Sequence, residues 1–212
     1  MRKLAVIFLF AILGNAWGQG VEITPQVSYL FGGRVNFYEG DLKIQDKGAF
    51  GINVAYDFGI GGGVEFQYTG ALTYASFNAI RYGYEDVSFK VAVNHIQIGG
   101  YKDLGQGKLK GYVSGAIGCT IFDPTEINYQ SKWNFTVSGS LGMKYFPLKF
   151  LGFKLFGRLF LPMEFAGGGV FCGIGTGGVD CGLGVSTFAI LVQGDLGAGI
   201  ILKFGGKDKS KK

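Results

Sequence analysis

Apolar and polar residues alternate along most of this chain. From Trp133 to Tyr145, every second residue is apolar or glycine, and those between are mostly polar or small. Side chains of a β-strand point alternately to the two faces of its sheet, so a period of two predicts a strand. Eight such segments follow one another, near residues 21–32, 48–58, 62–74, 86–102, 108–122, 133–145, 153–165 and 187–204. The pattern predicts an all-β protein with eight antiparallel up-and-down strands.

The fourth segment is irregular. Its first half sets the apolar parity with Val87, Phe89, Val91 and Val93, whereas Ile96 and Ile98 have the opposite parity. One extra residue in a strand reverses the parity. We therefore expect a β-bulge near Asn94–His95, with Lys90 on the polar face.

Alternation alone does not separate a membrane barrel from a soluble one, which has its apolar face inward. Here the polar face is mostly Gly, Ser, Thr, Ala and Asn, as a narrow interior requires, with few of the long charged side chains that a solvated surface carries. Aromatic residues gather toward segment ends, as interfacial girdles do: Tyr29, Phe31, Tyr56, Phe58, Tyr74, Trp133, Tyr145, Phe165 and Phe204. These features favour a transmembrane β-barrel.

The connections between segments alternate in length. Gly59–Gly61, Asp103–Gly107 and Pro147–Gly152 are short, whereas residues 33–47, 75–85, 123–131 and 166–184 form longer connections. Transmembrane barrels have short periplasmic turns and longer outer loops. With an even number of strands, both termini are predicted to be periplasmic.

The N-terminus has the features of an export signal. Arg2 and Lys3 precede an apolar run from Leu4 to Leu13, and small Ala16 and Gly18 follow. This order predicts a signal peptide at residues 1–18, cleaved after Gly18; the alternative is a short buried helix. The barrel would then span residues 19–204, followed by a basic periplasmic tail at 205–212.

Composition and charge limit the fold classes and partners that the chain is expected to have. The 39 Gly, 20 Phe and 11 Tyr favour a β-protein with tight turns. Much of the net charge of +5 comes from the two termini, and the region between them has 14 basic and 14 acidic residues. No basic stripe lies on the domain, so nucleic acid is not an expected partner.

The whole mature chain resembles the small outer-membrane β-barrel proteins of Gram-negative bacteria, the OmpX, OmpW and OmpA-transmembrane group, with their porin-like barrels. The terminal strand Gly194–Phe204 is similar to their C-terminal assembly signal, except that Gly205–Lys212 follow the final Phe. The resemblance implies an outer-membrane location, contact with outer-membrane lipids including lipopolysaccharide, and envelope proteins as partners. It implies little about activity or oligomeric state.

Strand parity also predicts which charged side chains face the interior. They are Glu22, Asp57, Glu65, Lys90, Lys110, Lys144, Lys154, Arg158, Glu164 and Asp195. An eight-stranded barrel is only just wide enough for side chains, and buried charges of both signs pair. We expect a salt-bridge network that fills the interior; the alternative is a narrow channel.

His95 is the only histidine, and it is the one candidate for catalysis. Outer-membrane lipid A deacylases and palmitoyl transferases, which are also small barrels, use His with Ser or Asp. The deacylase pattern would have Ser two residues after the His, where this chain has Gln97. The chain is therefore predicted not to be an enzyme, and no cofactor or metal is expected.

Cys172 and Cys181 flank the glycine-rich segment Gly173–Asp180. Export would allow a disulfide that ties this loop into a hairpin; the alternative is two free thiols. Cys119 is expected to face the lipid as a small apolar residue.

The predicted function is that of an integral barrel without enzymatic activity. It would act through its outer loops, such as 33–47 and 75–85, whose aromatic and charged residues suit a binding surface or a solvated girdle equally. Alternatively, it would be a subunit of an envelope assembly. The rival hypotheses are a narrow channel or a lateral path for small apolar solutes and, more remotely, a lipid-modifying enzyme.

Overall fold

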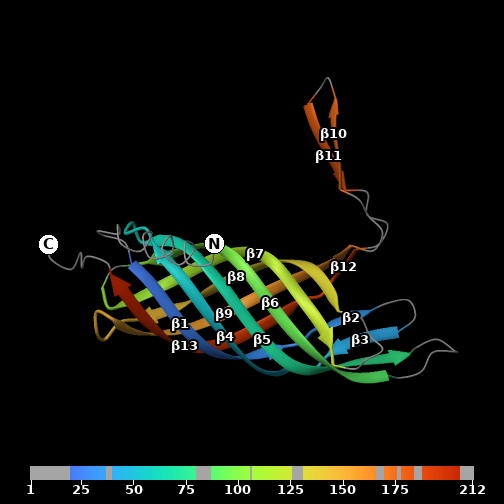
Figure 1. The fold of residues 1–212 in the computed structure, drawn as a ribbon, viewed down its shortest axis with the longest axis horizontal. Coiled ribbons are helices and arrows are strands. Elements are labelled where there is room, and N and C mark those ends of the chain that lie inside the picture. The colour runs from blue at the N-terminus through green and yellow to red at the C-terminus, as the bar shows by residue number, and fades with distance from the viewer. Residues whose placement is uncertain are drawn as a thin grey trace, which may run out of the picture.

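Eight long strands form the barrel in the computed structural model, and they wind around one axis (Figure 1). They are β1 (Gly20–Phe31), β4 (Lys47–Asp57), β5 (Gly62–Ala79), β6 (Val87–Leu104), β7 (Leu109–Pro124), β8 (Lys132–Tyr145), β9 (Leu151–Phe165) and β13 (Gln193–Gly205). Each pairs antiparallel with its neighbour, and β13 pairs with β1 from Gly20↔Gly205 to Phe31↔Gly194, which closes the barrel. The prediction of an eight-stranded antiparallel barrel is confirmed.

The structure describes residues 20–36, 40–79, 87–105, 107–125, 131–165, 170–175, 178–183 and 188–205. The predicted signal peptide at 1–18 and residues 206–212 of the predicted tail lie outside them. The described residues contain no helix long and apolar enough to cross a membrane.

Shorter strands lie within the connections. β2 (Arg34–Asn36) and β3 (Gly40–Ile44) form a hairpin within the predicted loop 33–47, and β3 pairs with the end of β5. β12 (Phe188–Ile190) pairs with the end of β9. β10 (Val170–Gly175) and β11 (Gly178–Leu183) form a separate two-stranded sheet.

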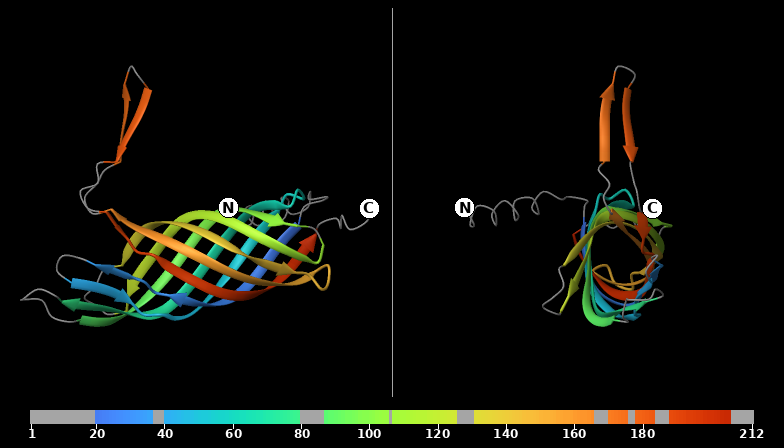
Figure 2. Two further views of the ribbon diagram at one scale, coloured as in Figure 1. Left: turned by 180° about the vertical axis from the view of Figure 1, so that it is seen from behind. Right: turned by 90° about the vertical axis from the view of Figure 1, so that its right-hand side faces the viewer.

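The two ends of the barrel differ. The short connections after β4, β6 and β8 are at the same end of the barrel as Gly20 and Gly205, which we call the turn end. At the loop end, β5 and β6 run on past their neighbours, and β3 pairs with the extension of β5 (Figure 2). The distribution of short and long connections is the one that the sequence predicts.

The outward face of the barrel is apolar. Leu141, Trp133 and Val27 are 70, 69 and 67% exposed, whereas most buried polar side chains point inward. A soluble barrel in water would have the opposite arrangement, because burying apolar area is the main driving force of folding there. The outward face therefore suits a lipid environment.

The predicted bulge in β6 is wrong. β6 stays in one unbroken register with β5 from Gly62↔Lys102 to Phe77↔Val87, and with β7 from Val91↔Pro124 to Leu104↔Gly111. As a consequence, Val93 is buried inside. Lys90 faces outward, with Nζ 5.8 Å from the centre of the Tyr74 ring, so its predicted place in the interior is also wrong.

The apolar residues of β6 change from one face to the other along the strand because the surroundings of the strand change. At the loop end, apolar side chains fill the interior; we call the buried ones the apolar cap: Leu30, Ala49, Ala71, Ala75, Val91, Val93 and Phe160. Outside, Ser76 lies 3.3 Å from Ser88, next to Lys90. Here β5 and β6 therefore place apolar side chains inside and Ser76, Ser88 and Lys90 outside, as a β-structure in water does.

Candidate functional site: the closed barrel interior

Charged side chains meet across the interior at the turn end. Glu22 on β1 accepts hydrogen bonds from Nζ of Lys144 on β8 and of Lys203 on β13, each at 3.1 Å. β13 and β9 separate β1 from β8 around the barrel, so the Glu22–Lys144 pair crosses the lumen. Both of its side chains are at most 3% exposed.

Further ion pairs lie beside this one. Lys203 lies 3.2 Å from Asp57, Lys144 lies 3.0 Å from Asp103, and Lys110 lies 3.8 Å from Asp103. Together with Glu22, these residues form what we call the ionic plug: Glu22, Asp57, Asp103, Lys110, Lys144 and Lys203. Because three carboxylates contact three ammonium groups, desolvation of the charges is offset by pairing.

Aromatic rings complete the packing beside the ionic plug. The Lys144 ammonium lies 4.3 Å from the centre of the Tyr101 ring, and the Lys154 ammonium lies 4.2 Å from that of Tyr112. Such cation–π contacts stabilise a buried ammonium group. Gly197 makes room for a further ring, since a Cβ there would lie 2.6 Å from the ring of Phe156.

Hydrogen-bonded polar side chains, charged and uncharged, occupy the middle of the interior. Glu65 accepts hydrogen bonds from Asn53 at 2.8 Å and from Gln67. Ser138 donates to Gln97 at 2.8 Å. The first set links β4 to β5, and the second links β8 to β6 across the intervening β7.

Arg158 and His95 lie in the same region. Arg158 donates to Thr69 at 3.0 Å and lies 3.7 Å from Asp195, the residue opposite it on β13. His95 is 1% exposed, and its Nδ1 lies 2.7 Å from Thr120 Oγ1. The described residues contain no cluster of three His, Cys, Asp or Glu side chains that would hold a metal.

The predicted interior charges divide into four groups. Buried inside are Glu22, Glu65, Lys144, Lys154, Arg158 and Asp195. Asp57 and Lys110 lie at the turn end, where each is partly exposed. Lys90 faces outward, as described above. Glu164 lies on β9, but its side chain is outside the described part of the chain.

Two members of the ionic plug are missing from the predicted set. The sequence pattern assigns Asp103 to a turn, whereas β6 continues to Leu104 and carries the side chain into the interior. Lys203 lies on the polar face of the last segment, opposite Phe204. That parity is the signal that identifies it.

The cysteines lie on β7 and on the separate hairpin. Cys172 and Cys181 occupy directly opposite positions of β10 and β11. Their side chains lie outside the described part, so the disulfide stays a prediction. Cys119 is a free, half-buried thiol on the outward face of β7.

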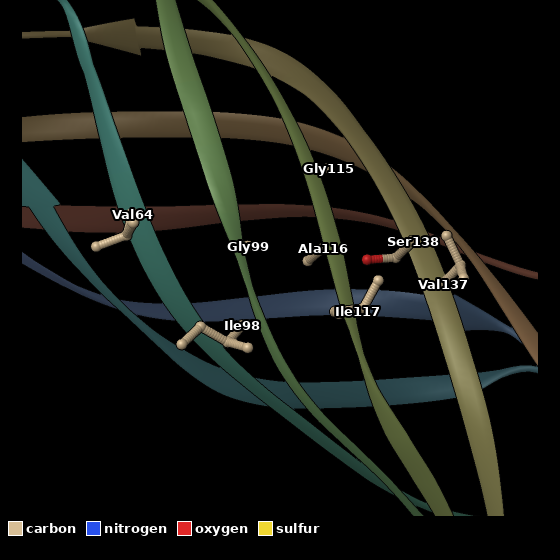
Figure 3. Close-up of a pocket in the computed structure, with 8 residues that line it drawn as sticks. All are labelled: Val64, Ile98, Gly99, Gly115, Ala116, Ile117, Val137 and Ser138. Atoms are coloured by element: carbon tan, nitrogen blue, oxygen red, sulfur yellow. The ribbon is translucent and has the colours of Figure 1, made fainter. Parts of the chain in front are cut away.

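The outward wall has one shallow groove of interest (Figure 3). Gly115 on β7 lies opposite Gly100 on β6 and Gly139 on β8, so three adjacent strands lack outward side chains there. Val64, Ile98 and other apolar residues border the groove. It is open to the surroundings, and none of its lining residues belongs to the ionic plug.

Comparisons with known proteins identify the architecture. No protein-family model matches the chain, and no curated protein matches it. Neisserial surface protein A has a similar structure, with a TM-score of 0.54 and 13% identity over 87% of this chain and 97% of that one. The outer membrane protein OprG from Pseudomonas aeruginosa has a TM-score of 0.59 and 11% identity over 88% and 96%. The chain has the fold of the eight-stranded outer-membrane β-barrels.

Proposed function

We propose that this protein is an integral outer-membrane barrel with a closed lumen and no enzymatic activity, acting through its loop end. It would bind a partner there or serve as a subunit of an envelope assembly. The observation that carries the proposal is that buried ion pairs lie across one end of the interior and buried apolar side chains across the other; we infer that the ionic plug and the apolar cap close the lumen. A closed lumen leaves the outer surface and loops as the functional parts.

The orientation in the membrane follows from general features of such barrels. Short turns are periplasmic and long loops are external, which puts the loop end outside and both termini in the periplasm. The apolar outward wall would contact lipid, including lipopolysaccharide in the outer leaflet. The polar outward face near Ser76, Ser88 and Lys90 would then lie above the hydrocarbon layer.

Opening the lumen would be costly. A path through the turn end must separate Glu22 from Lys144 and Lys203, and loss of one partner of a buried ion pair costs about 3–5 kcal/mol. A path through the loop end must displace packed side chains such as Leu30 and Phe160, which are both fully buried. A closed lumen favours a role as a membrane-anchored binding protein over a role as a pore.

The test is recovery of a partner through the loop end. The full chain is cross-linked in intact cells and purified in mild detergent, beside a variant that lacks residues 170–183, the β10–β11 hairpin. We expect an envelope protein that the full chain retains and that the variant loses, while both keep the heat-modifiable gel migration of a folded barrel. Recovery of the barrel alone from the full chain would count against a subunit role.

The second candidate is a route for small apolar solutes, and the apolar cap is the observation that favours it. Its interior surface would accept an apolar molecule from outside, but Arg158 and Asp195 below would stop it in the lumen. The solute would have to leave sideways through the wall. Faster uptake of a small alkane derivative by liposomes that contain the protein would favour this route over the anchored role.

A further inference from the structure

We propose that the groove on the outward wall holds one acyl chain of an anionic phospholipid, whose phosphate pairs with Lys102. The groove lies over Gly100, Gly115 and Gly139, on β6, β7 and β8 (Figure 3). With the membrane orientation of the proposed function, this lipid belongs to the periplasmic leaflet. The site concerns the lipid-facing wall, and it does not depend on what the loop end binds.

The floor of the groove is bare. Apart from its chain neighbours, a Cβ atom added to Gly115 or Gly139 would meet no atom within 4 Å, and one added to Gly100 would meet only a backbone oxygen at 3.7 Å. Outward Gly70 is different, because a Cβ there would lie 2.7 Å from the Tyr68 hydroxyl. The three bare glycines lie opposite one another on neighbouring strands, so the space above them is left for a molecule outside the chain.

The groove is long and narrow. Val64 on β5 and Leu159 on β9 close its two ends, at positions opposite the outer glycines. The side toward the loop end is formed by Ile98, Ile117 and Val137. Its volume of about 480 Å³ is in the range of small-molecule sites. A stable protein interface buries about 800 Å² on each partner, so a groove one side-chain row wide suits a single acyl chain better than a second protein.

Lys102 lies at the turn-end side of the groove. It follows Gly100 by two residues on the same face of β6, and its side chain is exposed. None of the ion pairs among the described residues includes it. An apolar groove with an ammonium group beside it matches the two parts of a phospholipid, the acyl chain and the phosphate.

The depth of the groove in the membrane fits this assignment. Lys90 and Lys102 both face outward on β6. At about 3.3 Å per residue and a tilt of about 40°, the twelve steps between them rise about 30 Å, slightly more than the apolar band of about 25 Å. The two lysines therefore mark the two edges of the band, and Gly100 lies just inside the periplasmic edge, where acyl chains begin.

The charge at the turn end favours an anionic head group. Lys108 and Lys149 are also exposed, in the turns that join β6 to β7 and β8 to β9. The carboxylates of this end pair within the ionic plug: Glu22, Asp57 and Asp103. Each lysine near a membrane surface attracts anionic lipid, so phosphatidylglycerol should bind better than zwitterionic phosphatidylcholine.

The test counts the lipids that stay bound. The full chain is folded in vesicles of phosphatidylglycerol and phosphatidylcholine in equal amounts, extracted in mild detergent and analysed by native mass spectrometry. We expect one phosphatidylglycerol on the unchanged protein and none on Gly115→Leu, which fills the groove. Gly48→Leu is the matched control, since Gly48 is an exposed glycine whose Cβ would also meet no atom within 4 Å. Heat-modifiable migration verifies that each variant folds.

A second pair of variants tests the head group. Lys102→Gln should lower the preference for phosphatidylglycerol over phosphatidylcholine about fivefold, whereas Lys90→Gln, at the other edge of the band, should leave it unchanged. An unchanged preference in Lys102→Gln would overturn the role of the phosphate. No retained lipid on the unchanged protein, or equal retention by Gly115→Leu, would overturn the site. A dimer that Gly115→Leu abolishes would show that the groove takes a second copy of the chain instead.

Discussion

Glu22 is the residue on which the ionic plug depends most directly. Its two carboxylate oxygens are divided between Lys144 and Lys203, so one acid links strands β1, β8 and β13. Removing one partner of a buried pair leaves an uncompensated charge, whereas an exposed lysine contributes little. This contrast gives the first prediction.

Lys144→Met should lower the free energy of unfolding by about 3 kcal/mol, because Glu22 and Asp103 both lose a buried partner. Lys90→Met is the matched control, since Lys90 faces outward, and its effect should stay within about 0.5 kcal/mol. Urea unfolding in lipid vesicles, followed by gel migration, measures both. Equal effects of the two substitutions would show that the plug does not stabilise the barrel.

The buried position of His95 makes a second prediction at this scale. His95 is enclosed by Thr120 and Phe160, and Gln97 occupies the position where a deacylase would have Ser. Lipid A from cells that express His95→Ala should therefore match lipid A from cells that express the unchanged protein, by mass spectrometry. A difference in acyl chains would mean that the protein modifies lipids.

β6 is the element in which sequence reasoning succeeded in part. Its existence and its length are readable from alternation, and so is the inward position of His95 and Gln97. The sequence does not say where along the strand the surroundings change from lipid to water. The alternation pattern therefore assigns Val91 and Lys90 to the wrong faces, since parity alone cannot separate a bulge from a change of solvent.

Cysteine labelling tests this interpretation of β6. In a background without the native cysteines, Lys90→Cys should react with a water-soluble maleimide in intact cells, and Val91→Cys should not, because Val91 is 3% exposed inside the cap. Heat-modifiable migration verifies that both variants fold. Labelling at position 91 but not at position 90 would indicate that β6 does contain the bulge predicted from the sequence.

The β10–β11 hairpin carries the disulfide prediction. Cys172 and Cys181 lie directly opposite each other, so their backbones are adjacent in the ladder. Protein purified without reductant should show one free thiol after denaturation, that of Cys119, and three after reduction. Three thiols before reduction would contradict the disulfide.

At the scale of the whole molecule, the sequence predicts more of the architecture than of the site. Eight period-2 segments and alternating connection lengths are sufficient for the barrel and its two ends. The ionic plug is harder to predict from the sequence, because parity shows that Lys144 and Lys203 face inward but not that both reach Glu22. Whether these side chains reach Glu22 across the lumen depends on the tilt of the strands. That tilt in turn depends on the register of all eight strands.

The central claim is that the barrel is closed, and single-channel recording in planar bilayers tests it most directly. The unchanged protein should give no stepwise conductance, whereas the double variant Glu22→Ala with Lys144→Ala, which empties the centre of the ionic plug, should give brief openings at most, because the apolar cap remains. Reproducible, long-lived openings of the unchanged protein would contradict the closed barrel and favour a narrow channel.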